Sequence, residues 1–138
     1  MCGITGKISF GEKPIVRSDI LAMTKAIAHR GPDGEGVYIS PDKKVGLGHR
    51  RLAIIDLSKN AAQPMSYCDR YQIVFNGEIY NYRENRKLLC DKGYHFTSQS
   101  DTEVILALYD HFGKECLHYM RGMFAFAIYD SKKNILFC

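Results

Sequence analysis

The sequence predicts an α+β fold in which sheets are covered by helices. Segments with the pattern of β-strands outnumber segments with the pattern of helices. The predicted helices are long, and groups of strands separate them, which is typical of the α+β class. The chain contains no internal repeat, low-complexity tract or linker, so we expect one compact unit to hold every motif.

The first predicted strand begins almost at the N-terminus. Partial alternation of apolar and polar residues over Ile4–Phe10 predicts this strand, which would tie the terminus down. A helix follows from Ser18 or Asp19, both of which suit an N-cap, and Gly31-Pro32 ends it. The predicted buried stripe of this helix consists of Ile20, Met23, Ile27 and Ala28.

A group of strands is predicted next. The turn at residues 41–44 joins the first two strands of this group, and the last strand stops at Gly77. The predicted strands are Gly36–Ser40, Val45–His49, Leu52–Asp56 and Tyr71–Asn76.

Capping boxes predict the starts of two further helices. Asn81 is followed three residues later by Glu84, and Ser100 is followed at the same spacing by Glu103. The second of these helices is amphipathic. The predicted ends are Gly93 and Gly113.

Two strands close the sequence. Met123–Tyr129 is an almost wholly apolar run of strand length, and we expect Ile135–Cys138 to pair with it. A run of this kind should be covered on both faces. Because the sequence stops in what resembles the middle of a strand, we expect residues 1–138 to be a truncated domain.

Length, composition and charge place the chain among ordinary soluble globular proteins. A chain of 138 residues is one domain by size, and its 46% hydrophobic and 25% charged residues do not indicate disorder. The net charge of +4 is spread without a single-sign block, so we expect no nucleic-acid partner. No segment suits a membrane span and no secretory leader precedes Cys2, so we expect no membrane association and a cytoplasmic location.

The cysteine pattern argues against both disulfides and zinc. Five cysteines form an odd set without a C-x-x-C pair, so we expect no metal site. Cys2 differs from the other four by its position. If Met1 is removed, Cys2 carries a thiol and a free α-amine, and an amine with a pKa of about 8 is able to take the thiol proton. The alternative is that a cysteine stands at this terminus without a role.

Three other stretches carry candidate binding groups. HRGPDGEG at 29–36 is flexible enough to approach a ligand, or it only ends a helix. In LGHRRLAIIDLS at 47–58, Arg50 and Arg51 face opposite ways along a strand, so one of them is able to grip a carboxylate while the other meets solvent. A surface ion pair is the alternative for these arginines. In SQSDTEVILALY at 98–109, Asp101 lies at a helix start, where it either receives an ammonium group or caps the helix.

The stretch FNGEIYNY at 75–82 carries candidate oxyanion donors. Asn76-Gly77 readily adopts positive φ, which would expose a side-chain amide together with a backbone N–H. The alternative is a plain two-residue hairpin turn.

Taken together, these stretches closely resemble the glutaminase domain of glutamine-hydrolysing asparagine synthetases, a branch of the class II glutamine amidotransferases. The similarity covers nearly the whole chain. The motifs that carry it are MCGITG, HRGPDGEG, LGHRRLAIIDLS, QPM at 63–65, FNGEIYNY, SDTEVILALY and RGMFAFAIYD at 121–130. The resemblance implies the fold of N-terminal-nucleophile hydrolases, a four-layer αββα sandwich with antiparallel sheets.

The resemblance also implies the reaction and the residues that perform it. Cys2 would attack the side-chain amide of L-glutamine, Asn76 and Gly77 would hold the oxyanion, and glutamate and ammonia would be released. Arg51 would bind the α-carboxylate of glutamine, and Arg50 would be its solvent-facing neighbour. The resemblance further implies an ammonium-binding side formed by Glu78 and Asp101, backbone contacts from Leu52 and Ile54, and no catalytic role for His29 or His49.

The family continues beyond the motifs present here. A synthetase domain or subunit would accept the ammonia and would use ATP and magnesium, while the glutaminase domain itself needs no cofactor. A homodimer is a further partner to consider. Two alternatives stay open. The chain is a non-catalytic module of the same fold, for glutamine binding or docking, or an inactive fragment of it. Otherwise Cys2 is a nucleophile that cleaves a different amide.

Overall fold

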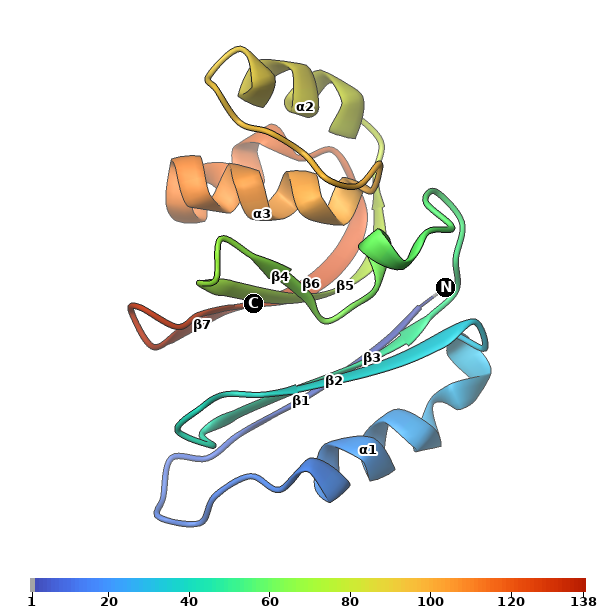
Figure 1. The fold of residues 1–138 in the computed structure, drawn as a ribbon, viewed down its shortest axis with the longest axis vertical. Helices are drawn as coiled ribbons and strands as arrows, with labels where there is room; N and C mark the ends of the chain where they lie inside the picture. Colours follow the sequence, from blue (N-terminus) through green and yellow to red (C-terminus); the bar gives the residue numbers. More distant parts are fainter. Residues whose placement is uncertain (1) are drawn as a thin grey trace.

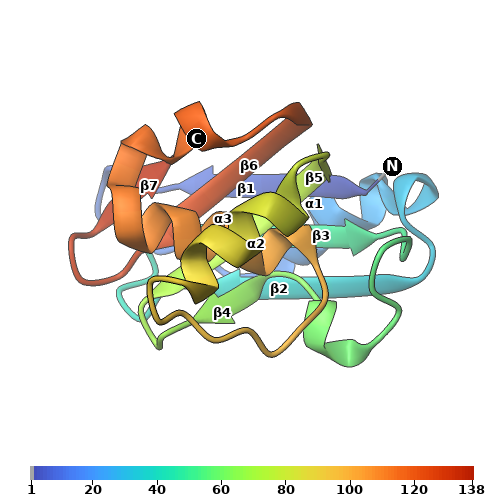
Figure 2. The same cartoon turned by 90° about the horizontal axis from the view of Figure 1, so that it is seen from above.

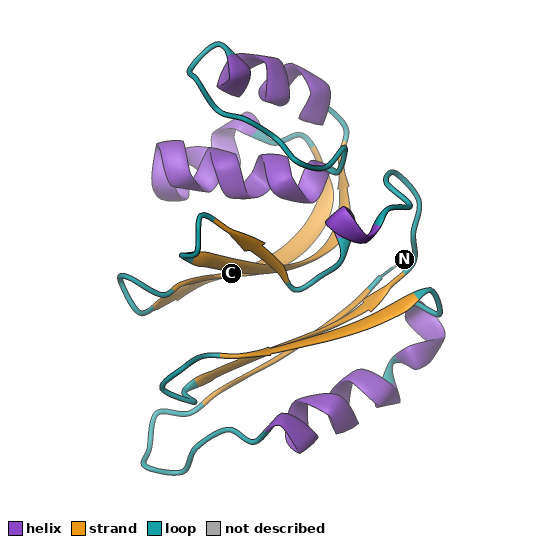
Figure 3. Ribbon diagram, viewed as in Figure 1, coloured by secondary structure: helices purple, strands orange, loops and turns teal. Residues whose placement is uncertain are grey.

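Two antiparallel sheets face each other, and helices cover their outer sides, in the computed structural model of the chain, which describes residues 2–138. Figures 1 and 3 show the layers in the order α1, first sheet, second sheet and α3, with α2 outside α3. The predicted α+β class and the αββα arrangement are therefore confirmed.

The first sheet has three strands in the order β1-β3-β2. The strands are β1 (Gly3–Ile8), β2 (Gly34–Ile39) and β3 (Val45–Arg51), and α1 (Arg17–Ala26) covers their outer face. This helix lies very close to β3. A Cβ atom on Gly48 would stand 2.3 Å from Thr24 Oγ1, so glycine at this position allows the buried Thr24 face of α1 to approach the sheet.

The second sheet has four strands in the order β4-β5-β6-β7. Helix α3 packs against this sheet, and Figure 2 shows α2 lying across α3. Eight consecutive residues of α3, from Asp101 to Leu108, are buried, because both the sheet and α2 cover the helix. The elements are β4 (Met65–Tyr67), β5 (Tyr71–Ile79), β6 (Gly122–Asp130), β7 (Ile135–Phe137), α2 (Tyr82–Cys90) and α3 (Asp101–Phe112).

Three short 3₁₀ helices complete the fold. One follows α1, one lies in the long connection between β3 and β4, and one connects α3 to β6. They span Ala28–Arg30, Lys59–Ala61 and Gly113–Tyr119. None of the helices in the described part of the chain is long and apolar enough to cross a membrane.

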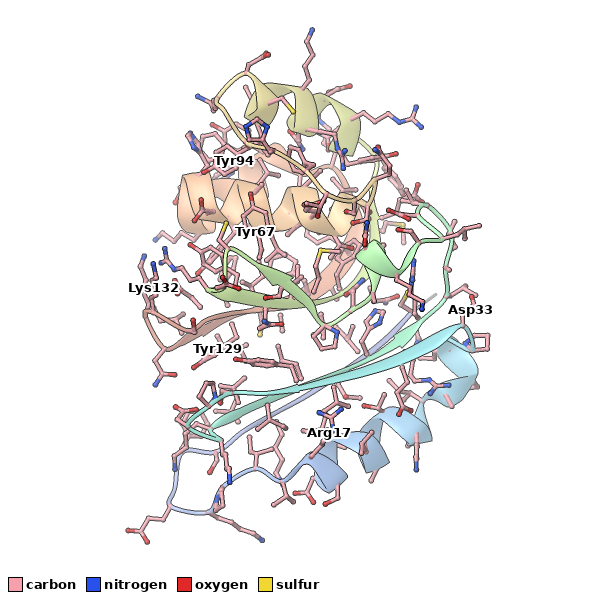
Figure 4. All side chains as sticks on the ribbon, viewed as in Figure 1. Arg17, Asp33, Tyr67, Tyr94, Tyr129 and Lys132 are labelled. Carbon is pink, nitrogen blue, oxygen red and sulfur yellow. The ribbon has the colours of Figure 1, made fainter. Side chains whose placement is uncertain are left out.

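A small core fills the space between the two sheets. Its buried members are Val45 and Leu47 from β3, Val74 from β5, and Tyr129 from β6, which Figure 4 labels between the sheets. His49 lies in the same space with no exposed surface, and its Nε2 donates to the carbonyl oxygen of Phe75 at 3.1 Å. This bond joins β3 of one sheet to β5 of the other.

The predicted strand Leu52–Asp56 is wrong. These residues form an irregular connection after β3, although Ile54 and Ile55 favour a strand by composition. The backbone N–H groups of this segment bond to side chains and not to a neighbouring strand. Leu52 N–H points at Cys2 Sγ at 3.3 Å, and Ala53 N–H donates to Asp33 Oδ2 at 2.9 Å.

One of the three predicted N-caps is also wrong, and a second has the predicted position but makes no capping bond. The residue before α1 is Val16, which makes no capping bond, and Asp19 instead pairs with Lys7 at 2.7 Å. Asn81 precedes α2, but its side chain bonds to the backbone of Tyr119 and Arg121. The cap at the start of α3 is confirmed: Ser100 Oγ accepts from the Glu103 N–H at 3.3 Å.

Several strands differ from the predicted ones in their bounds, and one was not predicted. The first strand ends at Ile8, and Phe10 is 95% exposed beyond it. The short strand β4 was not predicted, because three residues carry too little alternation to be recognised. Strand β5 does not stop at Gly77 but continues to Ile79.

Stability should fall as the pH drops below neutral because His49 is buried in its uncharged form. Burial lowers the pKa of His49 to about 4, and hydrogen bonding to Phe75 offsets this only in part. In the unfolded chain His49 therefore takes up a proton near pH 6.5, whereas in the folded chain it does so only near pH 4. We expect urea denaturation to give a free energy of unfolding lower by about 2 kcal/mol at pH 5 than at pH 7.

The variant His49→Gln separates this effect from other titrations. Glutamine keeps a donor for the Phe75 carbonyl but does not titrate. The decrease from pH 7 to pH 5 should shrink by most of its size in this variant, and an unchanged decrease would contradict the assignment to His49.

Candidate active site

A cavity of about 230 Å³ lies beside Cys2, just before the start of β1. Its wall is made by the start of the chain, the connection after β3, the last part of β5 and the start of α3. Every site residue predicted from the sequence lines it: Cys2, Arg51, Leu52, Ile54, Asn76, Gly77, Glu78 and Asp101. The structure thus brings the whole predicted set together.

Cys2 lies half-buried at the wall of this cavity. Its Sγ atom is 3.3 Å from the backbone nitrogen and 3.6 Å from the carbonyl oxygen of Leu52. Arg30 Nε donates to the Cys2 carbonyl oxygen at 3.2 Å, which fixes the main chain just before β1. Whether Met1 is retained concerns a residue outside those that the structure describes.

The outer edge of β5 faces the cavity along a row of alternating N–H groups. Strand β4 pairs with β5 only from Tyr71 to Ile73, so the edge beyond Ile73 has no neighbouring strand there. The Phe75 N–H donates to Gln63 Oε1 at 2.6 Å, and the Ile79 N–H donates to Asp101 Oδ2 at 3.0 Å. Successive residues of a strand point their N–H groups to alternate edges, so the Gly77 N–H lies on this same edge between those two bonds.

Gly77 belongs to a strand and not to the hairpin turn that its sequence also suggested. It pairs with Phe124 of β6, and its φ of +147° is a conformation that other residues rarely adopt. A Cβ atom here would lie 2.2 Å from the Met123 carbonyl oxygen. Positive φ was predicted correctly for Gly77, but it serves close contact with β6 inside a continuous strand.

Asn76 supplies a polar side chain to the same wall. Its Oδ1 atom is buried and has no hydrogen-bond partner among residues 2–138. A buried polar atom without a partner costs about 1–3 kcal/mol. A bound ligand group that donates a hydrogen bond to Oδ1 would remove that cost.

The two adjacent arginines have different surroundings. Arg51 lies at the cavity, where its Nη1 donates to the Ser58 carbonyl at 3.0 Å and its Nη2 donates to the Asp56 carbonyl. Arg50 does not face solvent as expected: its side chain is only 15% exposed and pairs with Glu35 at 2.7 Å. The strand alternation separated the two side chains correctly, but Arg50 lies on the face of β3 that packs on α1, where its Nε donates to the Gly31 carbonyl at 3.1 Å.

Two carboxylates lie at the other side of the cavity. Asp101 is buried at the start of α3, and Glu78 is exposed at the end of β5. Burial raises the pKa of Asp101, hydrogen bonds from Ile79 and from the helix start oppose this rise, and the charge of Glu78 adds to it. A cationic ligand group here would favour the ionised form of Asp101 and so lower its pKa.

Side chains hold the connection between β3 and β4 in place over the cavity. Asp56 accepts from the Gln99 N–H at 2.8 Å, and Asn60 Nδ2 donates to the Thr97 carbonyl at 3.3 Å. Asp33, which lies just before β2 and is labelled in Figure 4, accepts from the Ala53 N–H. The side chain of Ile54 is left 72% exposed at the cavity mouth, so only its main chain is placed to serve the interior.

Sequence reasoning missed Gln63 and Thr102. Both line the cavity, and Gln63 Nε2 donates to Thr102 Oγ1 at 3.4 Å. The motif QPM contains Gln63, but nothing in its pattern indicates that the side chain reaches β5. In the described residues no group of three or more His, Cys, Asp or Glu side chains is placed to hold a metal ion.

Comparison with known proteins identifies similar chains. Residues 1–138 match a family model described as a glutamine amidotransferase domain. The chain is 46% identical over 158 residues to a protein of Methanocaldococcus jannaschii named putative asparagine synthetase [glutamine-hydrolyzing] 2, and 46% identical over 143 residues to asparagine synthetase [glutamine-hydrolyzing] 1 of Bacillus subtilis. These alignments cover 100% and 99% of this chain but only 29% and 22% of the relatives.

A solved structure shares the fold. Glutamine phosphoribosylpyrophosphate amidotransferase from B. subtilis superimposes with a TM-score of 0.71 at 21% identity, covering 94% of this chain and 35% of that one. At this identity the likeness establishes the fold alone.

Gly77→Ala should strongly destabilise the protein. The new methyl group would collide with the Met123 carbonyl and would require a disfavoured φ, and together these effects are worth at least about 3 kcal/mol. Gly6→Ala is the matched control, because its Cβ would meet only ordinary contacts at 3.6 Å in another strand. Urea denaturation should show a large loss for the first variant and a change below about 1 kcal/mol for the second. Similar losses in the two variants would refute this account of Gly77.

Proposed function

The chain belongs to the glutamine amidotransferase domain family, and from this membership we propose that it hydrolyses the side-chain amide of L-glutamine through Cys2. The observation that carries the proposal is the meeting of three kinds of group in one cavity. These are the Cys2 thiol, the Asn76-Gly77 segment, and a pair of oppositely charged side chains, Arg51 and Asp101. A free amino acid that carries a side-chain amide needs all three.

The nucleophile is activated by its own residue. Once Met1 is removed, the α-amine of Cys2 accepts the thiol proton, and the sulfur attacks the amide carbon of glutamine. A bond from sulfur to carbon forms while the carbonyl electrons move to oxygen. Leu52 keeps the sulfur at the cavity wall through its main chain.

The resulting oxyanion is held by the Asn76 side chain and the Gly77 N–H. Donors fixed at such a position typically contribute a hundred- to a thousandfold each to the rate, roughly. When the intermediate collapses, the carbon–nitrogen bond breaks, and the proton on the α-amine goes to the leaving ammonia. Water then attacks the thioester, which releases glutamate and regenerates the thiol.

One end of the cavity selects a free amino acid, because the α-carboxylate and the α-ammonium of glutamine are bonded to the same carbon. Arg51 binds the α-carboxylate with guanidinium donors that its bonds to Asp56 and Ser58 leave over. Asp101 and Glu78 receive the α-ammonium, and the main chains of Leu52 and Ile54 complete the pocket. Opposite charges at the two sides of this end fix the orientation of the substrate.

The ammonia is proposed to serve a second unit. The relatives are named glutamine-hydrolysing asparagine synthetases, and this chain spans 29% and 22% of their length. We propose a synthetase domain or subunit as the ammonia acceptor, with ATP and magnesium used there. A cytoplasmic location and a homodimer stay predictions.

Replacing Cys2 should abolish activity. Cys2→Ala removes the only nucleophile of the mechanism, so glutamate release from L-glutamine should fall to the uncatalysed level. Cys90→Ala is the matched control, since Cys90 is an exposed free thiol at the end of α2. Equal glutamate release by Cys2→Ala and the parent chain would overturn the proposal, and intact-protein mass measurement establishes in each case whether Met1 is absent.

Glutamine binding should weaken with acid at a higher pH than an ordinary aspartate would cause. The pKa of Asp101 is raised by burial, so its negative charge, which the substrate ammonium needs, is lost earlier as the pH falls. In the Cys2→Ala background, calorimetry should show the Kd for glutamine rising as the pH falls from 7 toward the ordinary aspartate range near 4. The further change Asp101→Asn should weaken binding about 10- to 100-fold at pH 7 and remove most of the pH dependence. A Kd that is constant with pH would contradict the role of Asp101.

A further inference from the structure

The last part of β5 extends past its partner on one side. Strand β4 ends its pairing at Ile73, whereas β6 pairs with β5 as far as Ile79. Residues 74–79 are therefore supported by a strand at one edge only. The other edge carries the proposed oxyanion donor, the Gly77 N–H.

Side chains take the place of the missing strand at this edge. Gln63 Oε1 accepts from the Phe75 N–H at 2.6 Å, and His49 Nε2 donates to the Phe75 carbonyl at 3.1 Å. Asp101 Oδ2 accepts from the Ile79 N–H at 3.0 Å. Both main-chain groups of Phe75 and the donor of Ile79 are thus fixed on either side of Asn76 and Gly77.

Gln63 is itself held at both ends. Its Nε2 donates to Thr102 Oγ1 at 3.4 Å, in the first turn of α3 beside Asp101. The main-chain carbonyl oxygen of Gln63 packs against β2, where a Cβ on Gly36 would come within 2.0 Å of it. A residue anchored in this way transmits the positions of β2 and α3 to Phe75.

We propose that Gln63 is the positioning residue of the oxyanion donors and that it acts through the Phe75 N–H. The proposal rests on the proposed function of Asn76 and Gly77. Phe75 immediately precedes Asn76, so loss of its bond to Gln63 frees this end of the strand to shift. A misplacement of 1 Å costs a rate of the order of a hundredfold.

Three variants test this role. Gln63→Met has a similar length but no acceptor, and Gln63→Glu keeps an acceptor for Phe75 and accepts from the Thr102 hydroxyl through its second oxygen. Gln72→Met is the matched control, because Gln72 lies on the same strand and bonds only to the exposed Ser66 side chain, far along the strand from Gly77. Circular dichroism and thermal unfolding are used to choose a temperature and buffer at which all variants are folded.

The kinetic result expected is a split between kcat and KM. Gln63→Met should lower kcat for glutamine hydrolysis about 10- to 100-fold and change KM less than about threefold, since Arg51 and Asp101 are untouched. Gln63→Glu should lower log kcat by no more than half as much as Gln63→Met does, and Gln72→Met should keep the parent kcat. A kcat for Gln63→Met within twofold of the parent, or an equal fall in Gln63→Glu, would overturn the proposal.

Amide hydrogen exchange gives a readout that does not depend on activity. In Gln63→Met, the Phe75 amide should exchange faster and the Gly77 amide resonance should move, while Gln72→Met should leave both unchanged. An inactive parent chain would refute the proposed function alone, because the exchange result would still decide whether Gln63 positions the Gly77 amide. Unchanged Phe75 exchange and an unmoved Gly77 resonance in Gln63→Met would refute the positioning role whatever the activity.

Discussion

The structure of this site depends on one requirement of the peptide chain, namely that main-chain donors removed from water find acceptors. Strand β5 continues after β4 has ended, so its outer edge would leave a row of such donors without a strand to receive them. Side chains from the β3–β4 connection and from α3 accept two of them, at Phe75 and Ile79. The N–H of Gly77 between them is thereby left for a ligand. The proposed oxyanion donor is available here because the sheet is incomplete on one side.

Charge is distributed across the cavity in a way that suits a small zwitterion. Arg51 is fixed on the side of the first sheet, and Asp101 is fixed on the side of the second. Burial makes the charge of Asp101 costly until a cation arrives, while the neighbouring Glu103 is satisfied within the protein. Burial opposes the negative charge on Glu103, but hydrogen bonds from Ser98 and Thr97 outweigh it and lower the pKa of that carboxyl. Of these two acids in the first turn of α3, Glu103 is thus satisfied within the protein, while Asp101 is the one proposed to bind the ligand.

Local sequence patterns were sufficient for most elements and insufficient where long-range contacts decide. The helix start at Ser100 could be predicted because its cap lies three residues away, whereas Asn81 bonds to residues almost forty positions later. Ile54 and Ile55 suggested a strand, but contacts from Cys2 and Asp33 bind the backbone of that segment. The site residues were found through ordered motifs that resemble a family, and their meeting in one cavity agrees with that prediction. Gln63 could not be found, because its partner Phe75 is specified only by the fold.

The reacting groups belong to different halves of the sandwich. Cys2 precedes β1 in the first sheet, whereas Asn76 and Gly77 lie on β5 in the second. The gap that a substrate must bridge is therefore set by the thickness of the layer between the sheets, where Leu47, Val74 and Tyr129 act as spacers. The rate of the proposed hydrolysis would therefore depend on the separation of the sheets, and so on the volume of side chains that never contact the substrate.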